Sequence, residues 1–350
     1  MVTAAASLRR VIAALAVGGV LVAAPMSSQA DEADNPGLPR LPCSPQQVQD
    51  GFCTSDGNAF ERNANNWLNN AQNGLTGSVR AKQWARLPLT MLASNVLFSN
   101  RPGDGSITNL FQYDSFFVSP KGSGHPYGDT ALIPVRTVAF GSIPATVTLQ
   151  VSQRRDADGL PVPVHLEAEQ VDIAGPPAKT VLPPVVLDET VSVRVRSLSV
   201  DGVDVQLQKT CRTGTSARLR ASSEATEYDA AAGSPDDQFD QAHGFFGLSG
   251  GTLNGTIDIP AFSGCTTATG DDVSPLLTSA ISSTGNPLSI TIGAVGCFSF
   301  TDTRPLPTQP GATTPEAANC FEGATTNPDT RTIPFPRDFP DFAPGEQPLD

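Results

Sequence analysis

Residues 247–251, with the sequence GLSGG, are the ones whose types and spacing best suit catalysis. They lie shortly after His243. This stretch fits the G-x-S-x-G pattern, which places a nucleophilic serine on a sharp turn between a strand and a helix. After Ser249 comes GGTLNGTIDIP, which reads as a glycine pair followed by a strand and not by a helix. We therefore interpret the glycines as a bend before a strand, and we assign no catalytic residue.

The histidines offer Ser249 no clear general base. In α/β-hydrolases the catalytic histidine follows the serine, and no histidine follows His243 in this chain. A chymotrypsin-like order keeps the histidine first, but Leu248 stands where the GDSGG motif has an aspartate. His125 falls in a turn-like loop, and His243 lies only six residues before Ser249. His165 alternates with apolar neighbours and should face solvent.

Metal and cofactor sites have equally weak support in the sequence. Carboxylates gather in RRDADG (154–159) and SPDDQFD (234–240), where an extracellular calcium site is conceivable, but the ligand spacing of a defined calcium loop is missing. Asp and Gly in such stretches are typical of turns. The cysteines form no C-x-x-C pair and have no neighbouring histidine, which disfavours zinc. With no P-loop, dinucleotide or haem motif either, we expect no cofactor and no metal.

The first 30 residues read as a secretory signal peptide. Arg9 and Arg10 precede a short apolar core, VIAALAVGGVLVAA, and SQA then supplies small residues for cleavage after Ala30. The apolar run is shorter than the roughly 20 residues that span a bilayer. We expect a secreted or cell-envelope protein with no transmembrane helix after cleavage.

Composition narrows the class of protein. Without Arg9 and Arg10 the chain has 20 basic and 35 acidic residues, a net charge of −15, which disfavours binding to nucleic acid. Gly and Pro number 31 each while aromatic residues make up only 6% of the chain. This mixture favours short strands joined by turns over helical bundles.

We expect residues 31–125 to form an N-terminal arm with weak helices. FERNANNWLNNAQN is rich in asparagine and weakly helical, with Trp67 as its anchor. In SVRAKQWARLPLTMLASNVLFSN, apolar residues from Leu89 to Val96 recur at helical spacing, and Pro88 should break or kink that helix.

Residues 126–300 carry the strongest strand signal and predict an all-β fold, a disulfide-stapled antiparallel β-sandwich. Apolar residues alternate with polar ones around 147–151, 162–168 and 191–195, so each strand has one buried face. Asp201-Gly202 predicts a hairpin turn, and a shift in apolar phase predicts a bulge near Arg196-Ser197. TSAIS and LSITIG are expected to pair as a further hairpin around STGNP.

Residues 301–350 are rich in Pro and Thr and predict a disordered, extended tail that could contact the cell wall. The six cysteines all follow the signal peptide, and their even number in an exported chain predicts disulfides. Cys43–Cys53, which closes a short loop, is the simplest pair.

Residues 190–297 resemble a group of uncharacterised secreted actinobacterial proteins. The resemblance is carried by LSVDGVDV (198–205), CRT (211–213), GGTLNGTIDIPAFSGC (250–265) and DDVSPLLTSAISSTGNPLSITIGAVGC (271–297). It covers about a third of the chain and implies a secreted all-β body but no activity, cofactor or ligand.

Two arrangements of the remaining cysteines stay open. Cys265 and Cys297 flank the last motif and could staple its ends, which leaves Cys211–Cys320. Alternatively, Cys211 pairs with Cys265 or Cys297, and Cys320 takes the other. Either bridge should stabilise the fold by on the order of 3 kcal/mol.

The sequence favours an exported protein with a binding or structural role and gives no sign of enzymatic activity. A secreted hydrolase whose site is built from residues distant in sequence is the alternative. A third reading is an outer-envelope pore, but pore strands of about 10 residues should carry aromatic girdles. This chain has three tyrosines and two tryptophans, too few for such girdles.

Overall fold

Antiparallel strands make up most of the part of the chain that the structure describes. A computed structural model describes residues 67–120, 123–125, 127–139, 142–157, 159–229, 232, 238, 240, 242–293 and 297–299. The expected signal peptide (1–30), the Cys43–Cys53 pair and the expected tail (301–350) lie outside these residues.

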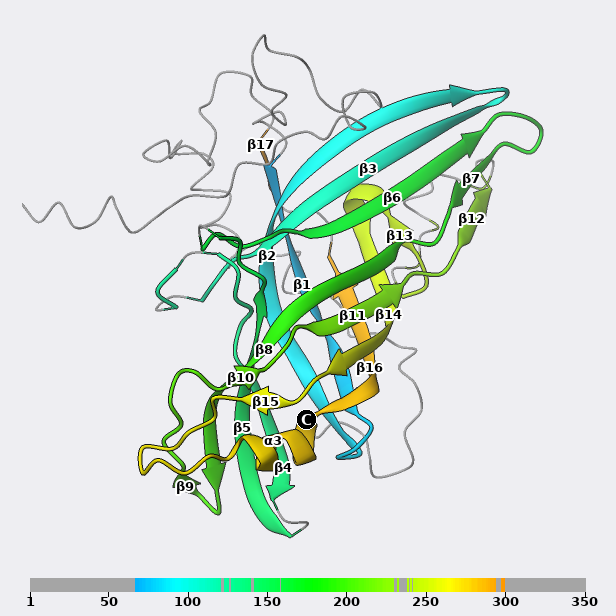
Figure 1. Ribbon diagram of the computed structural model, residues 1–350. Coiled ribbons are helices and arrows are strands. Elements are labelled where there is room, and N and C mark those ends of the chain that lie inside the picture. The colour runs from blue at the N-terminus through cyan, green and yellow to red at the C-terminus, as the bar shows by residue number, and fades with distance from the viewer. Residues whose placement is uncertain are drawn as a thin grey trace, which may run out of the picture. The chain divides into compact units, whose positions relative to one another are not determined.

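The principal strands range from four residues to 21 (Figure 1). They are β1 (Trp67–Ser78), β2 (Gln83–Gly103), β3 (Ser106–Phe117), β4 (Ile133–Ala139), β5 (Ile143–Gln153), β6 (Val164–Ile173), β7 (Lys179–Leu182), β8 (Val186–Val200), β11 (Ala217–Ser222), β12 (Thr226–Asp229), β14 (Gly250–Ile259) and β16 (Ser283–Ile292). The shorter elements are β9 (Val203–Asp204), β10 (Arg212–Thr213), β13 (Phe245–Phe246), β15 (Phe262–Ser263), β17 (Cys297–Ser299), a 3-10 turn η2 (Gly247–Ser249) and the helix α3 (Ser274–Ile281).

These strands form one antiparallel sheet that curls on itself. Across the sheet the neighbours run β4–β5–β8–β11–β14–β16–β1–β2–β3–β6–β7–β12. The curl brings β6 into contact with β8, and β2 into contact with β4, although neither pair forms a ladder. The all-β, antiparallel prediction is confirmed, and the two-layer sandwich stays a prediction.

The expectation of weak helices before residue 125 is wrong. Residues 67–78, 83–103 and 106–117 are the strands β1, β2 and β3, and they belong to the same sheet as the strands that follow. The asparagine-rich β1 is paired along both edges, by β2 on one side and by β16 and β17 on the other. Pairing with strands more than 200 residues away, which a local window cannot contain, overrides the weak helical preference.

Pro88 marks a β-bulge in this sheet and not a helix break. On β1 and β2, Gln72 faces Thr90 but Gly74 faces Leu87, so β2 has one extra residue between these pairs. A proline cannot donate a ladder hydrogen bond and is tolerated in a sheet at such an irregularity. The proline therefore fits inside a 21-residue strand.

Two local predictions for β8 are confirmed. Asp201 and Gly202 both have positive φ, 51° and 77°, and form the two-residue turn between β8 and β9. On β5, Leu149 pairs with Val195 while Thr148 pairs with Ser197, so Arg196 is the bulged residue. Both signals are local, which is why the sequence alone could predict them.

The expected hairpin between TSAIS and LSITIG is not formed. Ser274–Ile281 is the helix α3, with Pro275 in its first turn and Leu277 buried, and β16 starts directly after it at Ser283. Proline is well placed in the first turn of a helix because its missing N–H has no partner there anyway. No helix of the described chain is long and apolar enough to span a bilayer.

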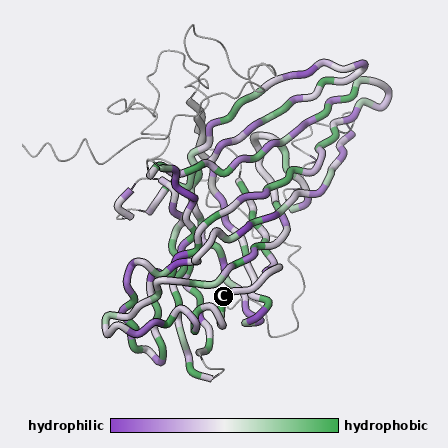
Figure 2. Tube along the Cα trace, in the orientation of Figure 1, coloured by the Kyte–Doolittle hydropathy of each residue, from purple (hydrophilic) through white to green (hydrophobic). Residues whose placement is uncertain are grey.

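The core lies on the concave side of the curled sheet. Alternate residues point inward, such as Val191, Val193 and Val195 on β8 and Leu166 and Ala168 on β6, each at most 5% exposed. Figure 2 shows the resulting alternation of apolar and polar residues along the strands. This alternation places two rows of apolar side chains face to face across the curl.

Candidate ligand-binding cavity

The apolar core lines a partly open cavity of about 130 Å³. Inward-facing side chains from strands at both ends of the described chain line it, among them Leu87, Leu149, Leu166, Leu187, Val193, Leu219, Leu288 and Ile290. An engineered apolar cavity of about 150 Å³ in another protein stays dry and binds benzene or xenon. A space of this size and lining can therefore accept a small apolar molecule or a short part of a hydrocarbon chain.

Strand periodicity explains why these side chains line the cavity. On β8, Leu187 and Val191 point into it, whereas Val186 is 65% exposed and Asp188 lies on the outer face. There Asp188 pairs with Arg218 of the neighbouring strand β11. Because successive residues of a strand face opposite sides, the same strand supplies both the apolar wall and a charged exterior.

Two of the polar side chains in the lining, the threonines Thr76 and Thr130, are already hydrogen-bonded to the backbone. The Thr76 hydroxyl donates to the Pro287 carbonyl at 3.1 Å. The Thr130 hydroxyl donates to the Ala131 carbonyl at 3.0 Å and accepts the Val151 N–H at 3.1 Å. Buried polar groups that are satisfied in this way need no partner from a ligand, so these threonines do not make the cavity polar.

Glu189 is the one charged residue among the described lining residues. It stands on the inward face of β8 opposite Leu219 of β11. Its Oε1 accepts the backbone N–H of His165 on β6 at 2.9 Å. Glu189 thus reaches across from β8 to a strand with which β8 forms no ladder.

We call the line along which β3 and β6 face β5 and β8 the seam. At one point Gln153 of β5 bridges it: its Oε1 accepts the Phe117 N–H, and its Nε2 donates to the carbonyls of Ser115 and Val162, each at 2.9 Å. Gln153 is 4% exposed. Side chains therefore close the seam in places where the ladder is missing, and Glu189 makes the corresponding contact to β6.

The serine of the G-x-S-x-G pattern lies in the turn η2, and the strand β14 follows it immediately, as the glycine-bend interpretation expects. Gly250 has φ 75°, and a Cβ there would lie 2.1 Å from the Ile292 carbonyl oxygen. At Gly251 a Cβ would lie 2.0 Å from the Gly244 carbonyl oxygen. Both positions require glycine because a Cβ at either one would collide with a backbone carbonyl oxygen.

Each histidine is paired with a carboxylate at a separate place. His243 Nδ1 lies 3.0 Å from Asp240 Oδ2 in the segment before β13. His165 Nδ1 lies 3.0 Å from Asp114 Oδ1, with the histidine side chain 43% exposed, close to its expected position facing solvent.

The loop after β3 brings together a serine, a histidine and an aspartate that the sequence analysis did not connect. His125 Nδ1 lies 3.4 Å from Ser119 Oγ, and His125 Nε2 lies 3.3 Å from Asp129 Oδ2. Burial lowers the pKa of His125, and the Asp129 carboxylate offsets part of that effect. Ser119 Oγ also accepts the Asp129 N–H at 3.1 Å, so it ties the loop together, and its distance from the histidine exceeds that of an activated nucleophile.

In the two acidic stretches considered for calcium, the carboxylates of Asp156 and Asp240 accept hydrogen bonds from nearby backbone N–H groups; of 234–240 the structure describes only Gln238 and Asp240. Asp156 Oδ1 accepts the Leu160 N–H at 2.9 Å, and Asp240 Oδ1 accepts the Ala242 N–H at 2.9 Å. Within the described ranges no group of three or more His, Cys, Asp or Glu side chains could hold a metal ion.

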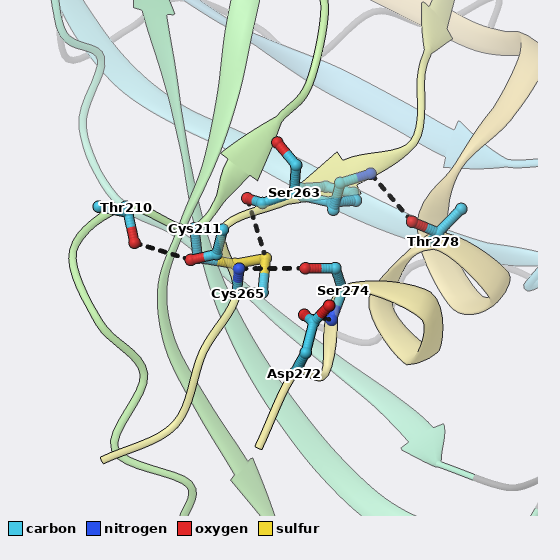
Figure 3. The surroundings of a disulfide bond; sticks show 9 residues. Thr210, Cys211, Ser263, Cys265, Asp272, Ser274 and Thr278 are labelled. Carbon is cyan, nitrogen blue, oxygen red and sulfur yellow. Dashed lines mark hydrogen bonds between the residues drawn. A yellow bond between two sulfur atoms is a disulfide. The ribbon is translucent and has the colours of Figure 1, made fainter. Parts of the chain in front are cut away.

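The disulfide joins Cys211 to Cys265, so the expected pairs Cys265–Cys297 and Cys211–Cys320 are wrong (Figure 3). The alternative arrangement, with Cys211 bonded to one cysteine of the last motif, included this bond. Both half-cystines are 0% exposed, and the Cys265 N–H donates to Ser274 Oγ at 3.1 Å. Hydrogen bonds from the hydroxyl and N–H of Ser274 lower the pKa of Asp272 just before α3.

The reason for the observed pairing is strand proximity. β10 directly follows Cys211 and pairs with β15, which ends two residues before Cys265. Cys211 and Cys265 therefore lie at the same end of the short β10–β15 ladder, close enough to bond. Cys297 is the first residue of β17, which pairs with β1 instead.

The comparisons with known proteins return no match: no family model, no curated protein and no solved structure matches this chain. Its function has to be inferred from the geometry of the described residues.

Sequence reasoning missed the cavity because one of its walls comes from residues assigned to helices. Ala85, Leu87, Pro88, Thr90 and Leu92 of β2 all line it. The available signal was short: Ala85 and Leu87 flank the polar Arg86, and the bulge at Pro88 then interrupts the pattern.

Proposed function

We propose that the protein is an exported, non-enzymatic binding protein that holds a small apolar molecule inside its curled sheet. The observation that carries this proposal is the cavity of about 130 Å³ between Leu187, Leu219 and Leu288, whose threonines are already satisfied by the backbone. Well-folded cores are close-packed, with few voids larger than a water molecule. A defined apolar space in such a core is the default candidate for a binding site.

Several features support export. The first 30 residues have the pattern of a signal peptide, and the fold contains a disulfide of the kind that persists in oxidising compartments. We propose a secreted or cell-envelope location of actinobacterial type, with the Pro/Thr-rich residues 301–350 as a contact to the wall. In this proposal the two facing halves of the sheet act as a β-sandwich whose interior is incompletely filled.

The function is tested by the binding of benzene, which suits a cavity of this size, measured by isothermal titration calorimetry. We expect saturable binding to the oxidised protein. Leu219→Trp, which fills the cavity from a half-buried position, should weaken binding at least about tenfold, or 1.4 kcal/mol. Val186→Trp on the exposed outer face is the control and should leave affinity unchanged.

Absence of saturable binding, or equal affinity in the Leu219→Trp variant with an unchanged circular dichroism spectrum, would overturn the proposal. Hydrolysis of a short-chain ester that is lost in Ser119→Ala would instead favour the secreted hydrolase, because Ser119 contacts the His125–Asp129 pair.

A further inference from the structure

We propose that the ligand is an amphiphile with a hydrogen-bond-donating head group, a hydroxyl or an ammonium, which enters through the seam and is held there by Glu189. This inference rests on the proposed function and specifies its ligand. It concerns a single carboxylate in an otherwise uncharged lining.

Glu189 occupies a position where an apolar residue would be expected. On the inward face of β8 its neighbours are Leu187 and Val191, and across the ladder it faces Leu219. Placing a carboxylate against apolar surface costs free energy unless hydrogen bonds compensate for the lost water. Glu189 is half-buried and its hydrogen bond is exposed, so water solvates it in the free protein. A ligand that excludes this water must replace it with a donor, because the protein itself supplies one partner.

That partner is the His165 N–H, which donates to Oε1 at 2.9 Å. Within the described residues, no group of the protein donates a hydrogen bond to the second oxygen, Oε2. An ionised carboxylate accepts hydrogen bonds and cannot donate them. Glu189 can therefore bind a hydroxyl or an ammonium, whereas the carboxylate of a fatty acid would meet like charge.

The seam is held less firmly at Glu189 than at Gln153. Gln153 is buried and makes three hydrogen bonds across the seam, to Ser115, Phe117 and Val162. Glu189 makes a single bond across it, at an exposed position. Separating β6 from β8 beside Glu189 thus breaks fewer contacts, and Val164 and Leu166 of β6 line the cavity directly behind it.

Charge outside the seam has the same sign as Glu189. On the outer face of β3 and β6, His165 lies between Asp114, at 3.0 Å, and Glu167, at 3.7 Å. With one histidine and two carboxylates beside the entrance, the local potential favours a cationic head group over an anionic one. The order of preference should be ammonium, then hydroxyl, then carboxylate.

The test displaces bound benzene with three amphiphiles of equal chain length: octylammonium, octanol and octanoate. At low salt we expect octylammonium to compete at least about tenfold better than octanoate, a ratio worth 1.4 kcal/mol. Glu189→Gln keeps an acceptor for the His165 N–H and should reduce this ratio to less than threefold, each competitor being measured against the variant's own affinity for benzene. Asp188→Asn, which removes the neighbouring outward-facing charge, is the matched control and should keep the ratio.

Equal competition by the three amphiphiles, or a preference that survives in Glu189→Gln, would overturn the inference while benzene binding still supports the cavity. Failure of benzene to bind the unaltered protein would overturn the proposed function, and this inference with it.

Discussion

Removing the disulfide should lower stability by an amount that follows from its place in the chain. Cys211 and Cys265 are 54 residues apart in sequence. In the chain-entropy account, a bridge that closes a loop of this length stabilises the fold by about 4 kcal/mol, because it restricts the unfolded chain. We expect Cys211→Ala/Cys265→Ala to lose about this free energy of unfolding.

The native structure around the bridge should survive the double substitution. The Cys211 carbonyl accepts the Val195 N–H at 3.1 Å, and the Cys265 carbonyl accepts the Val273 N–H at 2.9 Å. These backbone bonds do not depend on sulfur. Replacing both cysteines also leaves no lone buried thiol at positions that are 0% exposed.

Urea unfolding of the oxidised proteins, followed by fluorescence and extrapolated linearly, measures the difference. Ser263→Ala, an exposed change beside the bridge, is the control and should shift the free energy by less than about 0.5 kcal/mol. A loss below about 1 kcal/mol in the double variant, or peptide mapping that finds Cys211 bonded to another cysteine, would refute the reasoning.

Three further outcomes are expected. Gly255→Ala should destabilise the sheet by about 1–3 kcal/mol in urea unfolding, because the added Cβ would lie 2.0 Å from the Arg220 carbonyl oxygen. Gly103→Ala is the control and should be nearly neutral, because its Cβ would meet only the movable hydroxyl of Ser106. Leu253→Ala, at a site that is 0% exposed, should cost about 2–5 kcal/mol by the same measurement, and a smaller loss would mean that the core there is loosely packed. Burial lowers the pKa of His125 below its unfolded value, so its contribution to stability is fully present above about pH 6.5 and is lost as the pH falls from there through the lower pKa of the folded state. His125→Gln should reduce the change in the urea midpoint between pH 7.5 and pH 5.5. An equal change in the variant would contradict the lowered pKa of His125.

The features that the sequence predicted correctly are those set by neighbouring residues. Asp201-Gly202 specifies a two-residue turn because both positions take positive φ, and the phase shift at Arg196 reveals a bulge within a few residues. Alternation along β8 identified a one-sided strand before any partner was known.

The features that it did not predict depend on partners far along the chain. β1 has few apolar residues of its own and is a strand because β2 and β16 flank it. The cysteine pairing was left open because β10 and β15 bring Cys211 and Cys265 together only in the folded sheet. The cavity needs the same long-range geometry, since its walls come from strands that no local pattern connects.

The account depends most on the accessible apolar space inside the curled sheet. Crystals of the exported, oxidised protein held under xenon pressure test it directly, because xenon binds dry apolar cavities and is located by its anomalous scattering. We predict a xenon site enclosed by Leu187, Leu219 and Leu288. Side chains that fill this space, with xenon bound elsewhere or not at all, would contradict the central claim.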